Sequence, residues 1–282
     1  HWMDHGIRTF RVDNPHTKPI AFWHWLIEDI HRTDPDVVFL AEAFTDPAMM
    51  AKLAEVGFAQ SYTYFTWRHE PWELREYVTE LTTPPLVDLM RPSFWPNTPD
   101  ILDEALRWAP PAHFAMRFVL AATLVPIYGI YSGYELVENE PASMANTEYQ
   151  DSEKYQLRER DYSDPVLAPL IRTVNEIRRR HPEVWDLGDV RFHHSDNDRF
   201  LVYSRGHLDR DLLLCVVNLD PHQAQETTVR LDLGALGIPE GSPYEVHDEL
   251  GGERWRWQGD SAYVRLDPQV GQVAHLFHVT RG

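Results

Sequence analysis

The segment FRVDN at residues 10–14 constrains the fold more than any other part of the chain. Its apolar residues are typical of a strand, and Arg11 and Asp13 alternate with them, so both charged side chains face the same side of a sheet. The Asn-Pro step that follows ends the strand, because proline cannot donate a ladder hydrogen bond. A helical pattern opens at Thr17, so Asp13 is predicted at the C-terminal end of a strand that leads into a helix. (β/α) barrels place catalytic groups there, although a structural Arg–Asp ion pair is an alternative.

A second stretch repeats this arrangement. Residues 37–41 form a continuous apolar run, the pattern of a strand buried on both faces, and the run ends in Glu42. Residues 17–32 lie between the two strands, and their apolar residues fall at helical spacing. A strand–helix–strand unit makes the two strands parallel, so Asp13 and Glu42 are predicted at the same edge of the sheet, on neighbouring strands.

This placement suits a specific chemistry. Neighbouring strands lie about 4.8 Å apart, which leaves the two carboxyl groups within several ångström of each other. A retaining glycosidase needs a carboxyl pair roughly 5 Å apart. One carboxylate attacks the anomeric carbon, and the other, held protonated, donates its proton to the leaving oxygen.

Composition limits the possible partners and location. The 282 residues are 43% hydrophobic, which is enough for one large or two ordinary domains. The net charge of −18 argues against nucleic acid or an anionic membrane as a partner. No apolar stretch approaches the roughly 18 residues of a membrane span and no signal peptide is recognisable, so we expect a cytoplasmic location. Cys215, the single cysteine, lies in an apolar run and is predicted to be a small core residue.

The sequence predicts neither a metal site nor a cofactor. The 15 histidines form no HExxH motif, and there is no cysteine cluster. The stretch Ser195-Asp196-Asn197-Asp198 offers oxygen ligands for Ca²⁺. It lacks the downstream glycine and glutamate of a dedicated calcium loop, so a turn is the preferred interpretation.

Three motifs resemble, in order, the strand-4, strand-5 and strand-7 sequences of the α-amylase family, glycoside hydrolase family 13. They are FRVDNPHTKP from Phe10, FLAEAF from Phe39 and PNTPDIL from Pro96. The details are most similar to one branch, the maltosyltransferases that use α-maltose 1-phosphate to extend α-1,4-glucans. An amylase is expected to have Asn-His-Asp before its third acid, whereas this chain has the sequence NTPD at 97–100. The segments NPHTKP at 14–19 and DSEKY at 151–155 also follow the maltosyltransferase pattern.

The resemblance implies a role for each acid. Asp13 is the expected nucleophile, Glu42 the acid/base, and Asp100 the third acid, which holds sugar hydroxyls in the distorted transition state. Asp100 is also a candidate N-cap for a helix over 101–108.

Four further residues are expected to bind substrate. Arg11, on the face of Asp13, is expected to keep that nucleophile ionised. Asn14 matches a position that helps hold the donor phosphate, and its alternative role is to end the strand. Lys154 and Tyr155 match a lysine–tyrosine pair that binds the maltosyl unit, and the alternative for Lys154 is a solvated loop charge.

The predicted fold class is α/β plus all-β. Residues 1–186 are expected to form part of a (β/α)8 TIM barrel, about strands 4 to 8, and residues 187–282 a C-terminal antiparallel β-sandwich. Strands 1 to 3 of the barrel precede these motifs in the family, so we expect the chain to be the C-terminal part of a longer enzyme. Further helices and strands are predicted at 47–56 (helix), 58–65 (strand), 70–81 (helix), 91–97 (strand), 101–108 (helix), 113–124 (helix), 125–131 (strand) and 163–181 (helix), with a long polar loop at 133–161.

The predicted function is retaining transfer of maltosyl units from α-maltose 1-phosphate to the non-reducing end of α-1,4-glucans, with release of phosphate. In the family this reaction belongs to glycogen and α-glucan biosynthesis, and the resemblance suggests a homodimer. Two alternatives remain open. One is an α-glucan hydrolase of the same family, and the other is a non-catalytic glucan-binding fragment, because the first barrel strands are missing.

Overall fold

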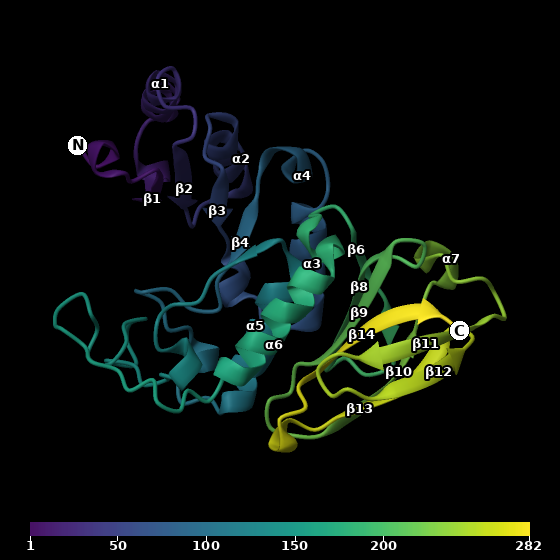
Figure 1. Cartoon of the computed structure of the whole chain (residues 1–282). Helices are drawn as coiled ribbons and strands as arrows, with labels where there is room; N and C mark the ends of the chain where they lie inside the picture. The colour runs from purple at the N-terminus through teal and green to yellow at the C-terminus, as the bar shows by residue number, and fades with distance from the viewer.

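The computed structural model describes residues 1–282 and contains one parallel and two antiparallel sheets. The parallel sheet has five strands in chain order: β1 (Thr9–Asp13), β2 (Val38–Glu42), β3 (Gln60–Tyr62), β4 (Pro92–Phe94) and β5 (Ile127–Tyr128). Its helices are α1 (Ile20–His31), α2 (Pro47–Glu55), α3 (Pro71–Leu81), α4 (Leu86–Leu89), α5 (Pro111–Leu124) and α6 (Ala168–Arg180). Figure 1 shows this half running from purple β1 to the green α6. No helix is both long enough and apolar enough to cross a membrane.

The two faces of β1 and β2 differ. Phe10 and Phe39 stack, with their ring centroids 5.9 Å apart, and pack on a small apolar cluster to which α1 and α2 contribute Trp23 and Leu53. On the opposite face of β1, Thr9, Arg11 and Asp13 are exposed. The alternation predicted for this segment is therefore confirmed, and the charged residues lie on the face that carries no helices.

The second half is antiparallel. A six-stranded sheet has the order β12-β11-β14-β9-β8-β6, and a three-stranded sheet has the order β13-β10-β7. Apolar residues of both sheets form a separate cluster that includes Val216, Val229 and Phe277. The bounds are β6 (Val190–Phe192), β7 (His194–Ser195), β8 (Phe200–His207), β9 (Asp211–Asn218), β10 (Gln225–Arg230), α7 (Leu233–Leu236), β11 (Pro243–Asp248), β12 (Arg254–Gln258), β13 (Ser261–Leu266) and β14 (Ala274–Arg281).

Helix α5 connects the two halves. Every residue from Phe114 to Leu124 is buried, and the largest apolar cluster of the chain joins this helix to Tyr203 and Cys215 of the six-stranded sheet. In Figure 1, α5 and α6 lie between the parallel sheet and the antiparallel sheets. The prediction that Cys215 is a core residue is confirmed, and burial raises the pKa of its thiol to about 12.

Several predicted elements differ from the observed ones in type or bounds. The helix over 101–108 is only a 3₁₀ turn at Glu104–Leu106, because Trp108 N–H donates to Asn139 O in the long loop instead of to a carbonyl group one helical turn earlier. The strand predicted over 58–65 ends at Tyr62, since a 3₁₀ turn begins at Tyr64. The Arg117 guanidinium donates a hydrogen bond to the carbonyl oxygen of Phe65, which is therefore not available to a neighbouring strand.

The helix expected from residue 163 begins only at Ala168. The preceding backbone is bound elsewhere, because Leu167 N–H donates to Glu135 O at 3.0 Å. The short elements β6, β7 and α7 were not predicted, because segments of two to four residues carry too little periodicity to be recognised.

Arg205 lies fully buried where α5 and β8 meet. Its guanidinium donates to Leu124 O at 2.7 Å, Val184 O at 3.3 Å and Asp186 O. The Arg205 side chain therefore satisfies carbonyl groups at the end of α5 and in the turn after α6, where no other donor replaces it.

We expect Arg205→Met to lower the free energy of unfolding by about 3 kcal/mol, because it leaves several buried carbonyl groups without a donor. Chemical denaturation monitored by circular dichroism measures this change. Arg210→Met is the control, since the Arg210 side chain is 60% exposed and its ion pairs contribute at most about 1 kcal/mol. Equal destabilisation by the two substitutions would contradict the role given to Arg205.

Candidate active site

The strand register places two predicted acids side by side. β1 and β2 pair in parallel with Asp13 opposite Glu42, and Asn14 N–H donates to Glu42 O at 3.1 Å. The expectation that both carboxylates end neighbouring strands is confirmed. Their environments differ, because Asp13 is exposed whereas Glu42 is only 5% exposed.

Arg11 contacts a different acid from the one expected. Its guanidinium forms an ion pair with Glu42, and no ion pair between Arg11 and Asp13 is present. The buried carboxylate attracts the cation more strongly because it is poorly solvated, whereas Asp13 is hydrated at the strand end. The simple Arg–Asp ion pair considered from the sequence is therefore wrong.

Glu42 is surrounded by competing influences on its pKa. Burial raises the pKa of its carboxyl, the Arg11 guanidinium lowers it, and the negative charges of Asp13 and Asp100 raise it again. The net shift is upward. The raised pKa favours the protonated form of the Glu42 carboxyl.

Aromatic rings continue the site beyond Arg11. The Arg11 guanidinium lies 5.4 Å from the ring centroid of Tyr62, and the Tyr62 ring stacks on Trp95 at 4.7 Å. Gly129 makes room for this arrangement, since a Cβ at that position would lie 2.2 Å from the Trp95 ring. Tyr62 was not predicted as a site residue. No signal in the sequence indicated this role, because the predicted strand over 58–65 places Tyr62 within the strand, whereas β3 ends at Tyr62.

Asp100 lies at the tip of a tight turn. Thr98 and Ile101 exchange two backbone hydrogen bonds of 3.2 Å, which leaves Pro99 and Asp100 projecting between them. The alternative role of Asp100 as a helix N-cap is wrong, because Asp103 caps the following 3₁₀ turn. Asp100 belongs to the same electrostatic environment as Glu42, whose pKa it raises.

Lys154 joins this acid to the long loop. Its Nζ lies 3.4 Å from Asp100 Oδ1 and 2.8 Å from Glu148 Oε1. Lys154 is therefore a paired charge instead of a free solvated one. Glu148 was not predicted, and its other carboxylate oxygen is buried without a partner. Tyr155 is 78% exposed and forms no side-chain hydrogen bond, so the structure does not bring it into this group.

The loop that carries Lys154 is fixed by its own ionic contacts. Arg160 bonds Glu138 at 2.9 Å and Glu153 at 3.0 Å, and its guanidinium lies 5.4 Å from the Tyr131 ring centroid. These contacts hold residues 131–160 beside the carboxyl edge of the parallel sheet.

Asn14 has an unusual backbone conformation, with φ 46° and ψ 52°. This left-handed region is tolerated by asparagine better than by most residues. It turns the chain sharply from β1 into the 3₁₀ turn at Pro15–Thr17 and leaves the Asn14 side chain exposed beside Asp13.

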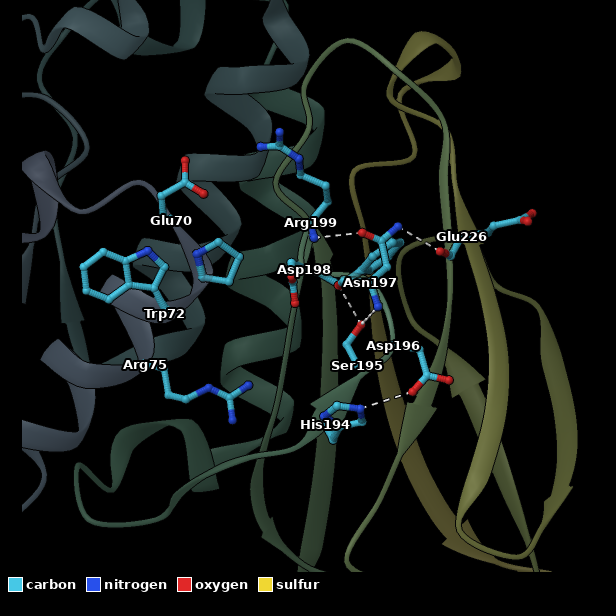
Figure 2. Close-up of a pocket in the computed structure, with 12 residues that line it drawn as sticks. Glu70, Trp72, Arg75, His194, Ser195, Asp196, Asn197, Asp198, Arg199 and Glu226 are labelled. Atoms are coloured by element: carbon cyan, nitrogen blue, oxygen red, sulfur yellow. Dashed lines mark hydrogen bonds and ion pairs between the residues drawn. The ribbon is translucent and has the colours of Figure 1, made fainter.

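A large pocket lies elsewhere. This pocket has a volume of about 1140 Å³ and lies between α3 and the segment 194–200. Figure 2 shows Trp72, Arg75 and Glu226 among the residues that line it. None of the predicted catalytic residues lines this pocket, so its size does not make it the active site. The loop 195–198 forms one wall as a turn: Asn197 Oδ1 accepts from Arg199 N–H at 2.9 Å. This agrees with the turn interpretation of that segment.

Comparisons with known proteins give relatives of one kind. Residues 192–279 match the family model described as "GLGE, C-terminal". The chain is 54% identical over 286 residues to α-1,4-glucan:maltose-1-phosphate maltosyltransferase 2 of Streptomyces coelicolor, covering 100% of this chain and 42% of that protein. It is 49% identical to the enzyme of that name from Corynebacterium glutamicum, covering 98% of this chain and 41% of the relative.

The fold is similar to that of α-amylases. The crystal structure of the α-amylase from Geobacillus thermoleovorans aligns with 99% of this chain and 61% of its own, with a TM-score of 0.75 and 16% identity. The chain spans about two fifths of the length of the curated relatives it matches. Over its whole length the chain is therefore similar in sequence to α-1,4-glucan:maltose-1-phosphate maltosyltransferases, and in fold to α-amylases.

Proposed function

We propose that this chain carries the acid–base and nucleophilic residues for transfer of maltosyl units from α-maltose 1-phosphate to α-1,4-glucans. The observation that supports this most is the opposed pair of Asp13 and Glu42 on neighbouring strands, one exposed and one buried. Two carboxyl groups in such unlike environments suit the two roles of a retaining mechanism. The names of the relatives give the substrate class.

In the first step, the Asp13 carboxylate attacks the anomeric carbon of the donor and phosphate leaves with the electrons of the broken C–O bond. A covalent β-maltosyl-enzyme forms on Asp13. Glu42 assists departure of the phosphate with its proton, as its raised pKa favours. In the second step, Glu42 takes the proton of the 4-hydroxyl at the non-reducing end of the glucan. That oxygen attacks the anomeric carbon, the bond between this carbon and the Asp13 carboxylate breaks, and the α-configuration is restored.

The remaining residues are assigned to substrate binding. Asp100 and Lys154 hold sugar hydroxyls: the Asp100 carboxylate accepts hydrogen bonds and the Lys154 ammonium donates them. Lys154 Nζ lies 3.4 Å from Asp100 Oδ1. Arg11 aligns the Glu42 carboxylate, and the exposed Asn14 amide donates to the departing phosphate. Tyr155 is positioned by sugar binding, since its side chain is 78% exposed and forms no hydrogen bond in the unbound chain.

We further propose that β1 to β5 correspond to strands 4 to 8 of a (β/α)8 barrel, within a catalytic part at residues 1–186, followed by a β-sandwich domain at residues 187–282. The likeness to α-amylases and the unbroken parallel order of the five strands support this. The relatives are more than twice as long as the region that aligns with this chain. Strands 1 to 3 of such a barrel would come from outside the aligned region. The cytoplasmic location and the homodimer stay predictions.

We expect Asp13→Ala to reduce phosphate release from α-maltose 1-phosphate with a maltooligosaccharide acceptor by at least about 10³-fold, because no nucleophile remains. Phosphate assay and chromatography of the glucan measure the loss, with lengthening by two glucose units in the unsubstituted protein. Asp29→Ala, on the exposed face of α1, is the control. The assay is run on this chain and on a longer chain that spans the whole length of the relatives.

The products separate the alternatives. Free reducing sugar without a phosphate requirement in either chain would show a hydrolase. Glucan binding without turnover in the longer chain, unchanged by Asp13→Ala, would show a non-catalytic protein and reject the proposal.

We expect Glu42→Gln to melt at a higher temperature than the unsubstituted chain at pH 8 while losing transfer activity. Burial raises the folded-state pKa of Glu42 above its ordinary value of 4.5, so the stability it contributes is complete below that value and is lost as pH rises through the folded-state pKa. Glutamine stays neutral, so the difference should vanish toward pH 4. Thermal melts at both pH values test this, with Glu55→Gln as an exposed control. A lower melting temperature at pH 8 would contradict it.

We expect Lys154→Met to raise KM for the maltosyl donor about tenfold, which corresponds to the loss of one charge-assisted hydrogen bond, about 1.4 kcal/mol. The melting temperature should change little, because the Lys154 side chain is 39% exposed. Initial-rate kinetics with Lys52→Met on α2 as control make the comparison. An unchanged KM would remove Lys154 from the substrate site.

A further inference from the structure

Outside the active site, three potential metal ligands converge where α6 meets the six-stranded sheet. His181 follows α6, Glu249 follows β11, and His278 lies on β14. One ligand atom of each residue lies within 4.8 Å of the others. The β11–β14 register explains part of this convergence, because it pairs His247, two residues before Glu249, with His278.

His181 is held in a particular orientation. The residue is 3% exposed, and its Nδ1 lies 2.8 Å from Asp211 Oδ1 and 3.0 Å from Oδ2. A carboxylate at Nδ1 keeps the proton on that nitrogen, which leaves the lone pair on Nε2. Histidine ligands of metals are commonly oriented by a carboxylate in this way.

The opposite nitrogen of His181 has no hydrogen-bond partner. Nε2 is buried, and although Glu249 Oε2 lies 3.3 Å away, the two atoms lack the alignment of a hydrogen bond. When His181 is neutral, its Nε2 lone pair faces a carboxylate oxygen in a buried place, and this arrangement needs a cation between the two atoms: either a proton on Nε2, which makes the contact an ion pair, or a metal ion. Arg180 supplies one from the side, with its Nη2 2.5 Å from Glu249 Oε2, but it does not reach Nε2.

We propose that His181, Glu249 and His278 bind a divalent transition-metal ion, with Zn²⁺ as the best fit. Two imidazoles and a carboxylate are a zinc donor set, whereas Ca²⁺ and Mg²⁺ prefer oxygen ligands alone. Ligand atoms around tetrahedral Zn²⁺ lie about 3.4 Å apart, so closure needs side-chain shifts of about 1 Å. The fourth position is taken by water or by His247, whose Nδ1 lies 3.9 Å from Glu249 Oε1.

Binding would move one existing partner. Arg180 must leave Glu249, and this is feasible because its side chain is 52% exposed. His278 gives access to the ion, since its side chain is 33% exposed. The bound ion would then link the end of α6 to β11 and β14, and so join the helical layer to the antiparallel sheet.

The test is a Zn²⁺ titration of the tag-free, chelator-treated chain by calorimetry. All proteins in this titration, including the reference, carry His5→Ala. The ring centroids of His1 and His5 lie 4.8 Å apart at the N-terminus, so this pair could bind a second Zn²⁺. We expect one Zn²⁺ per chain and a melting temperature that rises with the logarithm of free Zn²⁺. Co²⁺ should give the visible absorption of a tetrahedral complex, and Ca²⁺ should have no effect.

Substitutions assign the ligands. His278→Ala and Glu249→Gln should each weaken Zn²⁺ binding more than about 100-fold. Asp211→Asn, which disturbs the orientation of His181 and changes the carboxylate 3.6 Å from His278 Nε2, should weaken it by about 10–100-fold. His194→Ala, at an exposed histidine of β7, should leave binding unchanged. Circular dichroism confirms that each variant is folded. Absence of Zn²⁺ binding, or equal binding by the unsubstituted and both ligand variants, would overturn the proposal whatever the transferase assay shows.

Discussion

The burial of α5 is the constraint on which the two halves depend. Its residues from Phe114 to Leu124 are apolar almost all round, a pattern that suits a helix covered on every side. The parallel sheet covers one side and the six-stranded sheet, with α6, the others. Thr123 Oγ1 and Tyr203 Oη meet at 2.5 Å across this junction, so a hydrogen bond also joins the helix to the antiparallel half. The halves differ in secondary structure, yet they share one core.

At the carboxyl edge of the parallel sheet, the environment of each acid depends on how far its side chain is buried. Asp13 is exposed at the end of β1, whereas Glu42 is buried at the end of β2. Burial penalises the charge of Glu42. Arg11 moderates that penalty without reversing it. The raised pKa of Glu42 thus follows from its burial more than from specific hydrogen bonds.

Local patterns predicted the βαβ unit and the pairing of its acids, because alternation, a buried apolar run and a helical stripe all lie within about 30 residues. Family resemblance added Asp100 and Lys154, whose proximity depends on a loop fold that periodicity does not describe. The partner of Arg11 could not be predicted, since Asp13 and Glu42 lie on one face and only their burial separates them. Glu148 and the histidine cluster were missed for a similar reason, because their members come from separate segments and form no motif.

The small cluster beneath β1 and β2 has a consequence for motion. Its buried residues, among them Trp23, Phe39 and Leu53, form a group separate from the large core around α5. Regions with their own limited core open independently of the rest of a protein, as cooperative units of lower local stability. Asp13 and Glu42 both lie on strands of this unit. Local opening of this unit would therefore displace both acids of the pair while α5 and the antiparallel sheets stay intact.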